Sequence, residues 1–295
     1  MRLSCLHTHT NFCDGQDDIE TMIRAAWERG FASIGFSSHA PVAKKTGMTT
    51  GWHLSDDRLE EYCSAVRRAR HAWKDRIAVF LGLEADYIRG LVSPADRDFQ
   101  ELGLDYIIGS VHYILSPQGE PVTIDGPLEG FAKLVREQFA GDGERLMRSY
   151  WEALREMIRA GGFDILGHAD VIKKNNPDGT WFSLEGGAYR EELEKTAALL
   201  GSELRAGRSL TVEINTGGLN RNKTPDTYPS LPLLRLLAAE GVPVTISADA
   251  HRAAELGGRY DRARENLLAA GYSASVFFEG RRAGRPLWTA ENLED

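Results

Sequence analysis

The chain has 295 residues, of which 42% are hydrophobic and 26% charged, and this balance excludes a disordered or fibrous protein. The formal net charge of −8 disfavours nucleic acid as a partner, and the three cysteines are too few for a disulfide framework or a thiolate zinc site. No apolar run approaches the ~20 residues of a membrane span, and the N-terminus lacks a signal-peptide pattern. We therefore expect a cytoplasmic protein without a membrane partner.

Short apolar runs alternate with amphipathic stretches along the whole chain. The runs predicted as strands are 3–6, 31–36, 77–87, 105–113, 163–170, 209–218 and 243–251, with a shorter strand-like piece at 273–280. The stretches predicted as helices are 17–30, 56–73, 93–103, 128–160 with a break near 141–143, 188–207 and 230–241, with one more helix before the last strand-like piece.

Alternation of this kind indicates parallel strands wrapped by helices. With seven or eight strand-like runs, a (β/α) barrel is favoured over an open doubly wound sheet. No Gly-x-Gly-x-x-Gly follows a strand and no phosphate-binding Gly-x4-Gly-Lys-[Ser/Thr] occurs, so a dinucleotide or P-loop site has little support. We predict one domain over 1–295, in which 258–295 is a peripheral helix and strand extension.

The first strand runs into a His-x-His pair, His7 and His9, followed by Asp14. Side chains alternate along a strand, so the two imidazoles point to the same face and form a chelate for a divalent metal. An isolated pair of this kind would be read as a polar turn. The metal interpretation depends on whether the rest of the chain supplies further ligands.

Further donors stand at the ends of the other predicted strands. They are His39, Glu84, His112, His168, Asp249 and His251. In a barrel these strand ends converge on one mouth, where barrel enzymes carry their chemistry. Together with the first three donors they exceed the about four ligands of a single zinc ion. Imidazole and carboxylate without thiolate fit two to three ions of zinc, manganese or iron, and such a centre suits phosphoester hydrolysis.

Each donor taken alone has an ordinary structural explanation, such as a loop histidine, a helix cap or a polar group at a barrel rim. The metal hypothesis fails only if an ordinary explanation of this kind applies to every one of these donors at once. His53 and His71 are left out of the site: His71 lies in an arginine-rich helix, and His53 is interpreted as a loop residue.

The ordered motifs resemble the polymerase and histidinol phosphatase (PHP) superfamily, and more closely its monofunctional histidinol-phosphate phosphatases. The resemblance runs from Leu3 to about Gly257. The motifs that carry it are HTH, SSHAP, GLEADY, DYIIGSVHY, GHAD, EINTGGLNRNKTPDTYPS and SADAH. The family often has Asp before the second-motif histidine, where this chain has Ser38.

The resemblance implies a distorted (β/α)7 TIM-like barrel with a trinuclear metal centre. It implies that one ion takes His7, His9, Glu84 and Asp249, that a second shares Glu84 and adds His112 and His168, and that a third takes Asp14, His39 and His251. It also implies that a hydroxide bridging the first two ions is the nucleophile. The catalytic set implied is His7, His9, Glu84, His112, His168 and Asp249.

A phosphate monoester requires Arg, Lys or amide donors beside the metals. The candidates for this role are Lys173, Asn215, Arg221, Lys223 and Arg252. The imidazole and ammonium of histidinol require a carboxylate or an aromatic face, and Asp86 and Tyr113 are the candidates.

The leading hypothesis is hydrolysis of L-histidinol phosphate, a small-molecule phosphate monoester, in histidine biosynthesis. The alternatives are another PHP phosphoesterase, either a nucleotide phosphatase or a 3′–5′ exonuclease, or a non-catalytic PHP module stabilised by metal. The sequence leaves open whether the protein forms a homo-oligomer.

Overall fold

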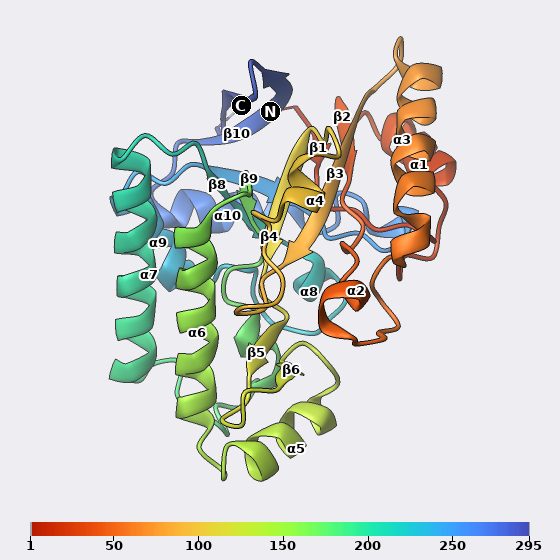
Figure 1. The fold of residues 1–295 in the computed structure, drawn as a ribbon. Helices are drawn as coiled ribbons and strands as arrows, with labels where there is room; N and C mark the ends of the chain where they lie inside the picture. The colour runs from red at the N-terminus through yellow and green to blue at the C-terminus, as the bar shows by residue number, and fades with distance from the viewer. Residues whose placement is uncertain (1, 295) are drawn as a thin grey trace.

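The centre of the fold is a seven-stranded parallel sheet curled into a barrel, as shown by the computed structural model, which describes residues 2–294 (Figure 1). In spatial order the strands are β1 (Ser4–Cys5), β2 (Ser33–Phe36), β3 (Ala78–Asp86), β4 (Tyr106–Ser110), β7 (Ile165–Leu166), β8 (Thr211–Asn215) and β9 (Val244–Ser247).

The two edge strands meet just beyond their ends. Thr8 and Ala250 form a parallel bridge, the His9 amide donates to the Ala250 carbonyl at 2.8 Å, and the Ala250 amide donates to the His7 carbonyl at 3.2 Å. The predicted (β/α)7 barrel is therefore confirmed, and its closure lies directly beside the first predicted metal ligands.

Helices lie around the barrel and beyond its mouth (Figure 1). They are α1 (Ile19–Glu28), α2 (Ala43–Thr46), α3 (Leu59–Trp73), α4 (Arg97–Gln100), α5 (Leu128–Gln138), α6 (Gly143–Ala160), α7 (Gly187–Arg205), α8 (Gly217–Asn220), α9 (Leu231–Ala239) and α10 (Tyr260–Ala270), with short 3-10 turns at Asp56–Arg58, Val171–Asn175 and Ala253–Glu255. Within residues 2–294, no helix is both long enough and apolar enough to cross a membrane.

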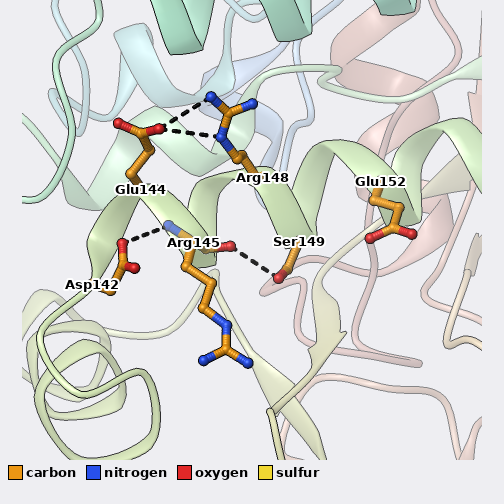
Figure 2. A pocket seen from close by; sticks show the side chains of 6 residues that line it. All are labelled: Asp142, Glu144, Arg145, Arg148, Ser149 and Glu152. Atoms are coloured by element: carbon orange, nitrogen blue, oxygen red, sulfur yellow. Dashed lines mark hydrogen bonds and ion pairs between the residues drawn. The ribbon is translucent and has the colours of Figure 1, made fainter.

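The predicted break in 128–160 is confirmed, because α5 ends at Gln138 and α6 begins at Gly143. Asp142 caps α6 by accepting a hydrogen bond from the Arg145 amide at 2.9 Å. The surface hollow along α6 is lined by charges that pair locally, including Glu144 with Arg148 at 3.1 Å (Figure 2).

Two expectations about secondary structure are wrong. The helix expected over 93–103 is reduced to the single turn α4, because it begins only after Asp96. A hairpin of β5 (Tyr113–Leu115) and β6 (Pro121–Thr123) follows β4, where no separate element was expected. This hairpin extends the loop beyond the mouth of the barrel.

The C-terminal segment closes the opposite end of the barrel. Strands β10 (Ala274–Arg282) and β11 (Arg285–Asn292) pair as an antiparallel hairpin at that end (Figure 1). Phe278 of this hairpin clusters with Leu6, Tyr106 and Ile165. Part of the region expected as a peripheral extension thus packs against the barrel interior. The N-terminal end of the barrel is filled with apolar side chains, so the open end is the one that carries the strand C-termini.

Candidate metal centre

All nine predicted metal ligands lie together at the C-terminal mouth of the barrel. The residues come from the segments that follow β1, β2, β4, β7 and β9, and from β3 itself. The side chains fall into four groups whose ligand atoms lie within 4.8 Å of one another, and one group also includes Asp86. The groups are His9, Asp14, His39 and His251; His7, His9 and Asp249; His7, Glu84 and His168; and His39, Asp86 and His112.

Glu84 is the central carboxylate of the mouth. Its Oε2 lies 3.1 Å from His7 Nε2 and 3.0 Å from His39 Nδ1, and its Oε1 lies 2.8 Å from His168 Nε2. Ser110 Oγ donates to the same Oε1 at 2.7 Å. Burial alone would raise the pKa of Glu84, but the surrounding imidazoles hold this pKa well below its ordinary value. The residue is therefore a carboxylate that several imidazoles share.

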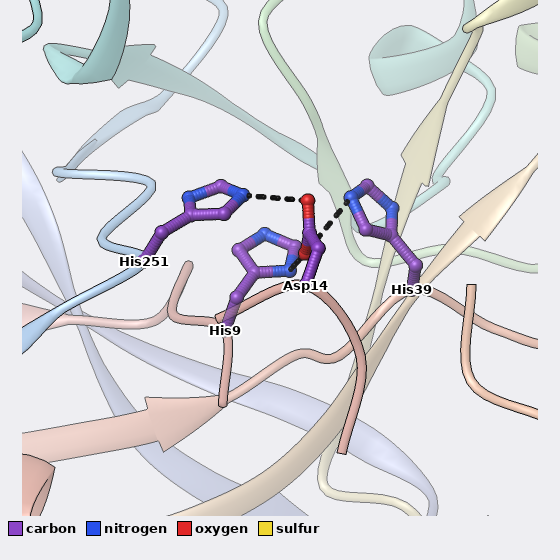
Figure 3. Close-up of side chains that lie close together, drawn as sticks. All are labelled: His9, Asp14, His39 and His251. Carbon is purple, nitrogen blue, oxygen red and sulfur yellow. Dashed lines mark ion pairs between the residues drawn. The ribbon is translucent and has the colours of Figure 1, made fainter. Parts of the chain in front are cut away.

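His9 connects the inner part of the cluster to an outer group that includes Asp14, His39 and His251 (Figure 3). On the inner side, His9 Nε2 lies 3.3 Å from Asp249 Oδ1. On the outer side, Asp14 Oδ2 lies 3.2 Å from His251 Nε2, and Asp14 Oδ1 lies 3.9 Å from His39 Nε2. Figure 3 shows His39 and His251 on opposite sides of the Asp14 carboxylate, as ligands of one ion would be.

Several ligand atoms are buried without a hydrogen-bond partner among residues 2–294. They are His7 Nε2, His9 Nε2, Asp14 Oδ1, His39 Nδ1 and Glu84 Oε2. A buried polar atom left unpaired costs about 1–3 kcal/mol, so proteins rarely leave several in one place. Coordination to cations would satisfy these atoms, and a donor set of imidazole and carboxylate fits borderline divalent metals.

Glu213, which the sequence interpretation missed, holds two of the imidazole ligands. It lies in β8, is fully buried, and has both carboxylate oxygens 3.0 Å from His7 Nδ1. Its Oε1 also accepts the His168 amide at 2.8 Å. A carboxylate on the far nitrogen fixes the tautomer that presents Nε2 to the mouth. The sequence signal that could have identified Glu213 is its position as the single acidic residue within the apolar strand TVEIN.

Asp86 orients His112 in the same way that Glu213 orients His7. It was expected to contact the substrate, but it does not line the cavity. Its Oδ1 lies 2.9 Å from His112 Nδ1, and its Oδ2 lies 2.8 Å from His53 Nε2. His53, left out of the site as a loop residue, does not line the cavity, but its side chain is only 4% exposed and contacts Asp86, which in turn holds the ligand His112. Its position in an irregular loop concealed this contact.

Two of the five residues expected to contact the substrate make their hydrogen bonds to other protein groups instead. Lys173 Nζ is buried and bonds both oxygens of Asp170 at 3.0 and 2.9 Å and the Thr227 carbonyl at 2.6 Å. Asn215 is buried and donates to Glu213 at 2.9 Å while accepting the Gly217 amide at 2.9 Å. Neither of these side chains lines the cavity at the mouth.

The other three expected contacts, Arg221, Lys223 and Arg252, line a cavity of about 800 Å³ above the cluster. Arg221 reaches deepest: its guanidinium donates to the Asp249 carbonyl at 2.6 Å and to Asp249 Oδ2 at 3.1 Å. Arg252 is about half exposed and pairs with Glu255 at 3.0 Å. The rest of the lining, called the outer wall below, includes Trp52, Asp125, Gly126, Pro127, Leu128, Val171 and Lys174.

A closed parallel barrel with a histidine and carboxylate cluster at its mouth defines a barrel enzyme built around divalent metal ions. The family model for the PHP domain matches residues 6–217, and the chain belongs to the PHP domain family. The family resemblance stated from the motifs is thereby confirmed.

Curated relatives are similar along most of the chain, and a solved structure shares its fold. A Deinococcus radiodurans protein named "Probable histidinol-phosphatase" is 28% identical over 94% of this chain and 96% of its own length. The histidinol-phosphatase of Bacillus subtilis is 24% identical over 86% of this chain and 96% of its own. The histidinol phosphate phosphatase of Lactococcus lactis, solved with zinc, L-histidinol and phosphate, is 21% identical with a TM-score of 0.67, covering 95% of this chain and 99% of that one.

Proposed function

We propose that this protein is a metal-dependent phosphomonoesterase that hydrolyses L-histidinol phosphate to L-histidinol and phosphate. The observation that carries the proposal is the set of nine converging imidazole and carboxylate ligands beneath a cavity lined by cationic side chains. The names of the full-length relatives support the choice of substrate.

We assign the ligands to three ions by their proximity and by the family pattern. His7, His9, Glu84 and Asp249 hold one ion; Glu84, His112 and His168 hold a second; Asp14, His39 and His251 hold a third. His112 Nε2 and His168 Nε2 are 3.2 Å apart, which suits two ligands of one ion. Zinc, manganese and iron all fit these donors, and the choice among them depends on metal availability.

When bound, such ions lower the pKa of a coordinated water and offset negative charge on phosphate oxygens. The chain itself contributes the orientation of the ligands and the recognition of the phosphate. Glu213 and Asp86 hold the far nitrogens of His7 and His112, and Arg221, with Lys223 and Arg252 further out, presents donors that suit a phosphate dianion. The proposal includes a cytoplasmic location, which the free thiols of Cys5, Cys13 and Cys63 support.

The test is phosphate release from L-histidinol phosphate, measured beside p-nitrophenyl phosphate, AMP and a short single-stranded DNA, with Mn²⁺ or Zn²⁺ present. His168→Ala is the inactive control, since it removes a ligand of the proposed second ion. We expect histidinol phosphate to exceed the other substrates by orders of magnitude in kcat/KM. Preference for AMP or DNA would favour the other PHP phosphoesterases, and no hydrolysis by the metal-loaded protein would favour a non-catalytic module.

A further inference from the structure

The hydroxyl of Tyr228 is buried beside the cavity and, within residues 2–294, has no hydrogen-bond partner. The residue is 3% exposed and lines the cavity above the metal centre. A buried tyrosine normally pairs its hydroxyl, because an unpaired donor loses its hydration without compensation. The sequence motif DTYPS that contains Tyr228 has no assigned part in the site described above.

The ring of Tyr228 is held in place from two sides. Its backbone pairs with Asn215 at the end of β8, through amide-to-carbonyl distances of 2.6 and 3.0 Å. The Lys173 ammonium lies 4.9 Å from the centre of the Tyr228 ring and is itself anchored by Asp170 and by the Thr227 carbonyl. Lys173, expected to contact substrate, thus supports a residue that lines the cavity.

The Tyr228 hydroxyl lies against Gly218, which lines the same cavity. It packs so closely on Gly218 that any side chain there would collide with the Tyr228 ring. Burial raises the pKa of Tyr228 well above its ordinary value, and the carboxylates of Asp125 and Asp170 raise it further. Arg221 lowers this pKa, but its effect is smaller than theirs. The phenol therefore stays protonated at any physiological pH and is a standing hydrogen-bond donor.

We propose that the Tyr228 hydroxyl donates a hydrogen bond to the ester oxygen of the phosphate monoester substrate. This inference rests on the proposed function. In the proposed pose, the phosphate group of the substrate faces the metal ligands and its alcohol portion lies against the outer wall. The ester oxygen, which joins these two parts of the substrate, then lies next to the Tyr228 hydroxyl. Hydrolysis breaks the bond between phosphorus and this oxygen, which keeps the electron pair. The attacking water supplies the oxygen gained by phosphate and the proton gained by the alcohol, so the phenol is unchanged after turnover.

The experiment compares Tyr228→Phe with Tyr189→Phe on two substrates. Tyr189, on α7, also has a buried hydroxyl without a partner in the described chain, but it does not line the cavity, so it is a matched control. Removal of one donor to a developing charge costs about 100-fold in kcat. We expect that loss for Tyr228→Phe on histidinol phosphate and a loss below about threefold on p-nitrophenyl phosphate, whose leaving group is a stabilised anion. Tyr189→Phe should leave both rates unchanged.

The ratio of the two rates does not depend on the fraction of correctly folded protein, so a partly unstable variant still gives an answer. Binding gives an independent readout: the Kd for L-histidinol should rise in Tyr228→Phe while the Kd for inorganic phosphate stays unchanged. Equal losses on both substrates, or no loss on either, would overturn the proposal for Tyr228. The wild-type substrate ranking separately tests the proposed function, and another preferred alkyl phosphate would simply replace histidinol phosphate in the comparison.

Discussion

The imidazole of His7 lies between two carboxylates, with Nδ1 3.0 Å from both oxygens of Glu213 and Nε2 3.1 Å from Glu84. Burial alone would lower the pKa of His7, but Glu213 and Glu84 together raise it well above its ordinary value in the metal-free protein. One carboxylate orients the ring from behind, and the other shares the metal side with it. Glu213 and Glu84 therefore have different functions, although they lie at similar distances from the His7 ring.

Glu213→Gln is expected to lower metal affinity by about 10–100-fold, as is typical when the partner of a ligand imidazole is removed. The variant keeps its shape but loses the negative charge that fixes the His7 tautomer. Excess metal should restore much of the activity. The matched control is Glu192→Gln, a buried glutamate paired with Arg148 and Arg155 between α6 and α7. Equal metal affinities in the two variants, measured by competition with a chelating dye, would contradict the role of Glu213.

Removal of the metal ions should destabilise the protein as well as inactivate it. The unpaired ligand atoms of His9, Asp14 and Glu84 gain partners only when ions are bound. A site filled at about a thousand times its Kd stabilises the folded protein by about 4 kcal/mol. We expect a chelator to lower the Tm and readdition of Zn²⁺ or Mn²⁺ to restore it. An unchanged Tm after complete removal of metal, verified by elemental analysis, would disprove binding at this cluster.

Metal binding should release protons at neutral pH. Burial would lower the pKa of His112 and of His251, but Asp86 and Glu84 raise the first to about 10, and Asp14 and Asp249 raise the second to about 9. An ion binds only the neutral imidazole, so metal affinity should rise with pH up to about 9–10. Calorimetry of Zn²⁺ binding at pH 7.5 in two buffers of different ionisation enthalpy measures the protons released. A binding enthalpy that is independent of the buffer would refute the expectation.

The same pKa values predict that the stability of the metal-free form depends on pH above 6.5 and that the stability of the metal-loaded form does not. A histidine whose folded pKa exceeds its unfolded value of 6.5 stabilises the fold below that pH, and the contribution is lost as pH rises through the folded pKa. The metal-free protein should therefore lose stability between pH 6.5 and about 10. The loaded protein has already released these protons and should not lose stability in that range, which paired thermal melts would test.

Arg221→Ala should reduce kcat/KM for the phosphate ester far more than Arg252→Ala. Arg221 is about one-quarter exposed and touches Asp249, whereas Arg252 is about half exposed and held by Glu255. Hydrogen bonds to charged groups are worth about 1.5–3 kcal/mol, which corresponds to about 10–150-fold, and solvent weakens those at the rim. Similar losses in the two variants would place the phosphate nearer the rim than we propose.

The barrel and the convergence of the nine donors could be predicted because both follow from short-range patterns. Apolar runs mark the strands, and a polar residue at each strand end marks the mouth, wherever the strand lies in the sequence. His7 and Asp249 are far apart in the chain, yet barrel closure brings them to the same edge. The prediction therefore needed the order of the strands but no knowledge of side-chain packing.

The supporting residues could not be predicted in this way. Glu213 was passed over because a buried acid in a strand has no partner that the sequence reveals. Lys173 follows His168 closely, but its direction is set by Asp170 and by the turn at Thr227, which only the tertiary fold brings near. His53 lies in an irregular loop with no periodicity from which to infer its orientation.

The closure of the barrel by Thr8 and Ala250 has a consequence for the synthesis of the protein. The inner cluster takes His7 and His9 from one end of this closure and Asp249 from the other, so a ribosome-bound chain can display the first two imidazoles long before their partner exists. A complete chelate forms only after residue 251 has emerged and β9 has docked. We therefore expect metal to be captured only after most of the chain has been made, because an ion held by the first two imidazoles alone would be bound weakly.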